Sequence, residues 1–166
     1  MPDVRDPVVI GIGSDYRRDD GVGLVVSRAI ADRKLERVRV ISGIAEGTRL
    51  IEAWENARAA FVIDCVSSGG KPGEIFRFDA LNEALPERIF SNHSTHCFSV
   101  TSTIELARVL KRLPHKLIVY GIEGGDFSSG EGLSAVVAEA AETVACSIAA
   151  EVDWLAVATQ LPEHET

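Results

Sequence analysis

The sequence predicts an α/β fold, a three-layer α/β/α sandwich in which a mostly parallel, twisted sheet has helices on both faces. Short β-branched runs alternate with stretches whose apolar residues recur at helical spacing. Strands that alternate with helices favour parallel pairing through right-handed crossovers, which leaves few topologies. The 166 residues, 46% of them hydrophobic, suffice for one core. We therefore expect a single domain over residues 1–166, with flexible termini at 1–6 and 160–166.

The first half of the chain contains three expected strands and two expected helices. The β-branched run at residues 8–11 predicts a strand, and a loop punctuated by glycines follows it. Val22, Val25, Val26 and Ile30 then recur at helical spacing, which predicts the first helix. The next elements are a strand at 38–41, a helix at 48–54 and a strand at 60–63 that is apolar on both faces.

The second half continues the alternation after a turn rich in glycine at residues 69–73. The short alternating pattern at 74–78 is typical of a strand at a sheet edge. A helix at about 99–113 should end before Pro114, which cannot continue it. The last expected elements are a buried strand at 117–120 and a long helix at 134–155 capped by Ser134.

Composition argues against several classes of function. The formal net charge of -8, with no run of Lys or Arg, would repel a phosphate backbone, so nucleic acid is not an expected partner. Three cysteines, Cys65, Cys97 and Cys146, form no CxxC pair, which argues against a disulfide framework and a structural zinc site.

The same sequence shows no sign of a membrane or of export. The polar residues 1–7 lack the basic and apolar regions of a signal peptide, which predicts a cytoplasmic protein. The apolar stretch at 144–158 contains Glu151 and Asp153, which would be costly in lipid, so we expect a packing helix there and no membrane partner.

Polar residues follow the first strand at the edge of the sheet where α/β proteins bind ligands. Gly11 and Gly13 resemble the start of a dinucleotide-binding loop, but Tyr16 stands where the third glycine is needed. Asp19 and Asp20 at the helix start would also repel a pyrophosphate. A helix cap and a favourable interaction with the helix dipole explain one of these acids, and explain both less well.

Asp64 and a histidine loop complete the candidate site. Asp64 directly follows the buried run 61–63, beside the loop of the first strand, although a loop-capping aspartate is an equally good explanation. His93 and His96 lie in the loop before the helix at 99–113, where a histidine is more often only solvated. Two carboxylates and an imidazole on separate exposed loops can bind a divalent first-row ion such as nickel or zinc. Cys65 should face away from Asp64, because neighbouring strand residues point to opposite faces.

Several segments together resemble the nickel-iron hydrogenase maturation endopeptidases, over nearly the whole chain. The loop from Gly11 to Gly23 is similar to the family's GxGNxLxxDDGxG opening, whose last acid is a metal ligand. The other similar segments are Phe61-Val62-Ile63-Asp64, Ser94-Thr95-His96 and Gly130-Glu131-Gly132-Leu133-Ser134. The departures are Ser14 in place of Asn, Ser42 where some members carry Asp, and Gly124 after Glu123 where Pro is frequent.

The resemblance implies a metal-dependent endopeptidase that removes the C-terminal extension of a hydrogenase large-subunit precursor after nickel insertion. It assigns Asp20, Asp64 and His96 as both metal ligands and catalytic residues. Nickel would arrive with the precursor, and zinc or another divalent ion could substitute in the isolated protein. We expect a monomer with the precursor as its partner.

Two other functions stay open at this point. A non-proteolytic module could hold the metal centre of a precursor with the same three ligands. A flavodoxin-like carrier of a flavin or nucleotide would share the architecture, because fold alone does not set function. Whether Cys97, His93 or Ser42 contributes to the site also stays open.

Overall fold

The computed structural model describes residues 5–90 and 99–159 and confirms the predicted α/β fold. One five-stranded sheet has the strand order β2-β1-β3-β5-β4, and only its edge strand β4 is antiparallel to its neighbour. The strands are β1 (Val8–Gly11), β2 (Arg39–Ser42), β3 (Ala60–Val66), β4 (Ile75–Asp79) and β5 (Leu117–Glu123). The pattern at 74–78 therefore correctly predicts an edge strand.

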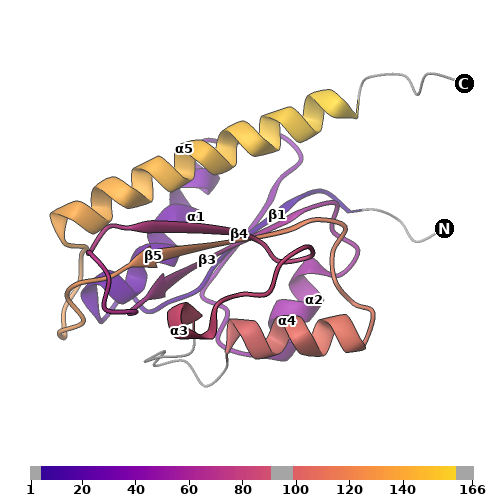
Figure 1. Cartoon of the computed structure of the whole chain (residues 1–166). Coiled ribbons are helices and arrows are strands. Elements are labelled where there is room, and N and C mark those ends of the chain that lie inside the picture. The colour runs from indigo at the N-terminus through magenta and orange to yellow at the C-terminus, as the bar shows by residue number, and fades with distance from the viewer. Residues whose placement is uncertain (1–4, 91–98, 160–166) are drawn as a thin grey trace, which may run out of the picture.

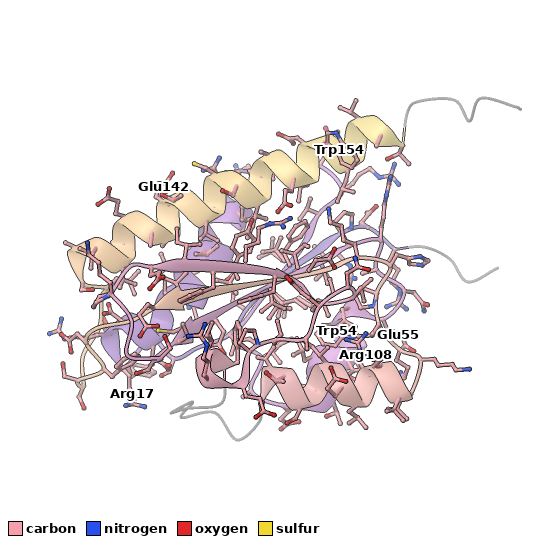
Figure 2. All side chains as sticks on the ribbon, viewed as in Figure 1. Arg17, Trp54, Glu55, Arg108, Glu142 and Trp154 are labelled. Atoms are coloured by element: carbon pink, nitrogen blue, oxygen red, sulfur yellow. The ribbon has the colours of Figure 1, made fainter. Side chains whose placement is uncertain are left out.

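Helices cover both faces of the sheet (Figure 1). On one face lie α1 (Val22–Asp32), which follows the 3-10 turn η1 (Arg18–Gly21), and the long α5 (Ala135–Ala158). On the other lie α2 (Gly47–Trp54), α3 (Glu87–Phe90) and α4 (Val100–Val109). Two apolar clusters fill the spaces between sheet and helices. Trp54, labelled in Figure 2, is fully buried in the cluster between the sheet and helices α2 and α4. Its Nε1 donates a hydrogen bond to the Arg112 carbonyl at 3.0 Å.

Strands β3 and β5 are longer than the sequence predicts. The expected strand ends were residues 63 and 120, but the two strands pair residue by residue as far as Val66 and Glu123. β3 continues past Asp64 and β5 continues as far as Glu123 because each strand pairs with the other along this stretch. Asp64 therefore lies within β3, and the prediction that it follows the strand is wrong. The strand ends at Val66, three residues later than expected.

Helix boundaries also differ from the predictions. The expected helix at 99–113 is the shorter α4, whose N-cap Ser99 accepts a hydrogen bond from the Ser102 N–H at 3.3 Å. The single turn α3 is too short to leave a periodic pattern in the sequence. Ser134 is the N-cap residue of α5 as predicted, but its side chain makes no capping hydrogen bond. Within the described residues, no helix is long and apolar enough to cross a membrane.

Glycines press the start of α1 against the sheet. A Cβ added at Gly11 would lie 2.3 Å from the Gly23 carbonyl oxygen. A Cβ added at Gly23 would lie 2.3 Å from the Ile12 oxygen and 2.4 Å from the Ile63 oxygen. Since real side chains never approach backbone so closely, this contact between α1, β1 and β3 requires glycine. It holds η1 at the carboxyl edge of the sheet.

Candidate active site

Four buried carboxylates gather at the carboxyl edge of the parallel strands. Asp19, Asp20, Asp64 and Glu123 are only 0–6% exposed, and no Lys, Arg or His in residues 5–90 and 99–159 is buried. The expectation that Asp20 and Asp64 lie on exposed loops is therefore wrong. Burying acids without a buried base is unfavourable unless hydrogen bonds or a cation compensate the charge. Hydrogen bonds provide this compensation for Asp19 and Glu123.

Asp20 reaches this edge through the loop that follows β1. Gly13 has a φ of 147°, and a Cβ there would lie 2.2 Å from the Asp20 carbonyl oxygen. The loop can therefore fold back against η1 only because residue 13 is glycine. Arg17, labelled in Figure 2, precedes η1 and pairs with Gly130 near the start of α5. This pairing joins the loop after β1 to the loop after β5.

Asp64 is the first β3 residue beyond the end of β1, whose last residue Gly11 pairs with Ile63. Its neighbour on β5 is Gly121, which has no side chain to cover the carboxylate. A Cβ at Gly121 would lie 3.1 Å from Val66 Cγ1 and 3.2 Å from the Phe90 ring. Phe90 therefore packs beside Gly121, the β5 neighbour of Asp64.

Cys65 faces away from Asp64, as the alternation along the strand predicts. It packs with the apolar cluster on the α1 and α5 face of the sheet. Burial raises the pKa of the Cys65 thiol strongly, and the negative charges of Asp64 and Asp20 raise it further. Without a bound cation the thiol is therefore neutral at physiological pH, and its position on the opposite face from Asp64 argues against a role as a ligand beside that carboxylate. Both carboxylates act on this one thiol, which is consistent with the contact between η1 and β3.

Asp19 has a structural role that the sequence did not reveal. Its carboxylate accepts hydrogen bonds from the backbone N–H groups of Gly125, Asp126 and Ser134 at 2.7–2.9 Å, and from the Ser134 hydroxyl at 2.9 Å. Burial opposes its ionisation, but these bonds outweigh that effect and hold the pKa of Asp19 below its usual value. It does not cap α1, whose N-cap is Gly21. Asp19 instead fixes the loop between β5 and α5, and it engages the hydroxyl predicted to cap α5.

Glu123 has the equivalent role on the other side of the site. Its Oε1 accepts from the backbone N–H groups of Ser68 at 2.9 Å and Gly70 at 3.2 Å, and its Oε2 accepts from the Ser68 hydroxyl at 2.7 Å. These bonds hold the loop between β3 and β4. Sequence reasoning missed this residue because the expected strand ended at residue 120, although an acid at the end of an apolar run is the same signal that selected Asp64.

The other candidate residues have different outcomes. His96, His93 and Cys97 lie outside the described residues, so their predicted roles stay untested. Ser42 ends β2, and its hydroxyl lies 2.6 Å from the Ser27 hydroxyl, which itself donates to the Leu24 carbonyl. Within the described part of the chain, no three His, Cys, Asp or Glu side chains form a group that could hold a metal ion. Asp20 and Asp64 could therefore supply only part of a coordination sphere.

Comparison with known families decides the class of the protein. The model of the HycI hydrogenase maturation protease family matches residues 24–151. The chain belongs to the hydrogenase maturation protease family. As a member of this family it is a peptidase, and the resemblance seen in the sequence is confirmed. The matched residues of this maturation protease include Asp64 and Glu123 but begin after Asp20.

Solved structures agree with this assignment at the level of the fold. The hydrogenase maturating endopeptidase HybD from E. coli is 20% identical, with a TM-score of 0.75 over 89% of this chain and 92% of its own. The [NiFe] hydrogenase maturation protease HycI from Thermococcus kodakarensis is 24% identical, with a TM-score of 0.65 over 92% and 94%. A search of curated proteins finds no match to this maturation protease.

Proposed function

We propose that this maturation protease removes the C-terminal extension of a nickel-iron hydrogenase large-subunit precursor once nickel has been inserted. We further propose that Asp20 and Asp64, together with His96, bind the nickel that the precursor carries. The observation that supports this most strongly is the pair of buried carboxylates, from η1 and β3, at the carboxyl edge of the sheet. The proposed site of action is the cytoplasm, and the proposed active form is a monomer.

The donor set fits a metal that is shared with the substrate. Carboxylate oxygens and an imidazole nitrogen suit divalent ions of nickel and zinc, but three protein ligands leave coordination positions open. The precursor's own ligands to nickel could fill those positions. The isolated protein should therefore bind Ni²⁺ or Zn²⁺ only weakly. Purification with one tightly held metal ion per chain would contradict this proposal.

The site's own residues would then position the substrate for hydrolysis. Asp20 and Asp64 would supply oxygen ligands to the ion, and their burial would keep bulk water away from it. The bound ion would supply positive charge that polarises the scissile carbonyl or activates water. A carboxylate beside it could act as the general base. Shared coordination would also hold the peptide bond near these groups, which lowers the entropic cost of reaction.

Cleavage of the precursor can be tested directly. Purified protein is incubated with purified, nickel-loaded large-subunit precursor, and the mass of the large subunit is followed. We expect the loss of a C-terminal peptide with the wild-type protein, and no loss with Asp64→Asn. Stable binding without any change of mass would instead identify a non-proteolytic module. A flavin spectrum in the purified protein would support the flavodoxin-like alternative, which the four acids at the edge disfavour because they repel phosphate.

A further inference from the structure

A groove lies beside the start of β4, at the same end of the sheet as the buried carboxylates. It has a volume of 570 Å³ and lies between residues 71–75 and the first turns of α5. Ile75 and Val136 are apolar side chains in its lining that are 37% and 50% exposed. We call this feature the β4–α5 groove. It is bounded on one side by the turn that leads into β4 together with Ile75, and on the other side by α5.

The backbone of β4 presents hydrogen-bonding groups to this edge. The Ala80 N–H donates to the Leu117 carbonyl, and the Glu74 carbonyl accepts from the Glu123 N–H, each at 2.9 Å. The backbone hydrogen-bonding groups of residues 74 and 80 therefore point toward β5. In an antiparallel strand the N–H and C=O groups of successive residues point alternately to one neighbour and to the other side, so those of residues 75, 77 and 79 point away from β5. No strand within the described residues pairs with that edge.

At the Asp79 end of β4, the outward-pointing N–H group already has a partner within the protein. The Asp79 N–H donates to the Glu83 carboxylate at 2.9 Å, so the turn after β4 takes up this donor. The remaining outward positions are Ile75 and Arg77. Because β4 is antiparallel to β5, Ile75 lies at the end nearer to Asp20 and Asp64. An added strand would therefore lead from the groove to the carboxyl edge of the sheet, at which Asp20 and Asp64 lie.

The walls of the groove are tied to the loops that surround the site. A Cβ at Gly125 would lie 2.8 Å from the Pro72 ring and 3.9 Å from Asp19 Oδ2, so Pro72, which lines the groove, is adjacent to the Asp19 cluster. The Gly73 N–H donates to the Glu123 carbonyl at 2.8 Å. A Cβ at Gly73 would lie 3.0 Å from the Val136 carbonyl oxygen, and its φ is 86°. The two bounding segments thus approach each other closely beside the site.

We propose that the β4–α5 groove binds the C-terminal extension of the large-subunit precursor as an added β-strand beside Ile75–Arg77. This inference rests on the proposed function, and it identifies where that function holds its substrate. Backbone pairing with Ile75 and Arg77 fits an extended peptide of varied sequence. An apolar peptide side chain would pack between Ile75 and Val136. Continuity with the site through Pro72 and Gly125 would place the scissile bond beyond the Ile75 end.

The apolar contact is tested by two matched charge substitutions on α5. Val136→Glu adds a carboxylate in the groove, whereas Val157→Glu adds one at the other end of the same helix, where the side chain is 60% exposed. With nickel-loaded precursor as substrate, Val136→Glu should lower kcat/KM roughly ten-fold, mainly through KM, because a charge would replace an apolar contact. Val157→Glu should leave kcat/KM unchanged. Equal rates for both variants and the wild type would overturn the inference.

The backbone contact is tested at Ile75. Ile75→Pro removes the outward N–H, and proline is tolerated at such a position of an edge strand. Ile75→Ala keeps the N–H and shortens the side chain, so it serves as the matched control. Loss of one hydrogen bond should lower kcat/KM about three- to ten-fold beyond the effect of alanine. Equal kcat/KM for the proline and alanine variants would contradict strand addition.

Amide exchange provides a readout that does not depend on cleavage. The wild-type protein is mixed with an excess of nickel-loaded precursor, and exchange along β4 is followed before the precursor is consumed. The amides of Ile75 and Arg77 should become protected. Unchanged exchange at both amides in a formed complex would overturn the inference while leaving the proposed function intact. A wild-type protein that cuts no precursor would overturn both.

Discussion

Asp19 and Asp20 are adjacent, identical in chemistry and both buried, yet the structure gives them different surroundings. The Asp19 carboxylate accepts four hydrogen bonds from the loop between β5 and α5. Asp20 lies in η1, which contacts β3, the strand that carries Asp64. Glu123 and Asp64 form a second such contrast, since Glu123 fixes the loop between β3 and β4.

A buried acid at the edge of an α/β sheet can therefore either stabilise the surrounding loops or take part in the reaction. Asp19 and Glu123 stabilise the loops on two sides of the candidate site. We infer that Asp20 and Asp64 act on the substrate's metal. The two pairs should then respond differently to substitution by the amide, which preserves shape and removes charge.

The largest expected effect is on processing. Asp20→Asn and Asp64→Asn should each lower the rate of precursor cleavage by more than about a hundred-fold. Substitution of residues that only hydrogen-bond to metal ligands already lowers activity by up to about a hundred-fold, and loss of a ligand itself should lower it further. The free energy of unfolding should stay within about 1 kcal/mol of the wild type. Rates of mass loss and urea unfolding measure the two quantities. The control Ser42→Ala, which breaks the contact with Ser27, should retain full cleavage. An Asp64→Asn protein that cleaves at the wild-type rate would remove this residue from the site.

Asp19→Asn should show the opposite pattern. An amide cannot accept four bonds from four donors, and its NH₂ group would face backbone N–H groups, so we expect a loss of about 3 kcal/mol in unfolding free energy. Cleavage per folded molecule, measured at low temperature, should fall much less than with Asp64→Asn. Unchanged stability would show that the Asp19 hydrogen bonds do not hold the loop.

The low pKa of Asp19 makes this stabilisation depend on pH. A carboxyl whose pKa is lower in the folded than in the unfolded chain stabilises the fold above its unfolded value, and the effect is lost as pH falls through the folded value. The ordinary pKa of an aspartate side chain is 3.8, and the hydrogen bonds hold the pKa of Asp19 below that value in the folded protein. The stability difference between wild type and Asp19→Asn should therefore be constant above about pH 5 and shrink below pH 3.8. A difference that grows on acidification would contradict this assignment.

Glu123→Gln should have the smallest effect. The amide oxygen can still accept one of the bonds from Ser68 and Gly70, so the expected loss of unfolding free energy is about 1–2 kcal/mol. The effect should be local, with faster amide exchange at Ser68 and Gly70 and no change at Gly125 and its neighbours. Faster exchange throughout the sheet would argue that Glu123 supports the core and not one loop.

The sequence predicts most of the fold because its strands are short β-branched runs and its helices carry an apolar period. The predictions fail where a charged residue lies inside a strand. The expected strands ended at residues 63 and 120, short of Asp64 and Glu123, but pairing between β3 and β5 extends both strands to include these acids. Pairing is a long-range effect that a local pattern does not contain.

The candidate site is predicted less completely. Asp20 and Asp64 could be selected because their segments end at one edge of the sheet, and the structure brings those segments together. The role of Asp19 could not be predicted, because its partner Ser134 lies 115 residues away in the sequence. Gly13 and Gly23 belonged to a recognised motif, but the close backbone contacts that require them appear only in three dimensions.

The most direct test of the account compares two forms of one substrate. Purified precursor with nickel and purified precursor without nickel are each incubated with the wild-type protein, and the large-subunit mass is followed over time. If Asp20, Asp64 and His96 complete a site around the precursor's metal, the nickel-loaded form should lose its C-terminal extension. The nickel-free form should stay intact at any enzyme concentration. Equal trimming of both forms, with no metal added, would contradict the account.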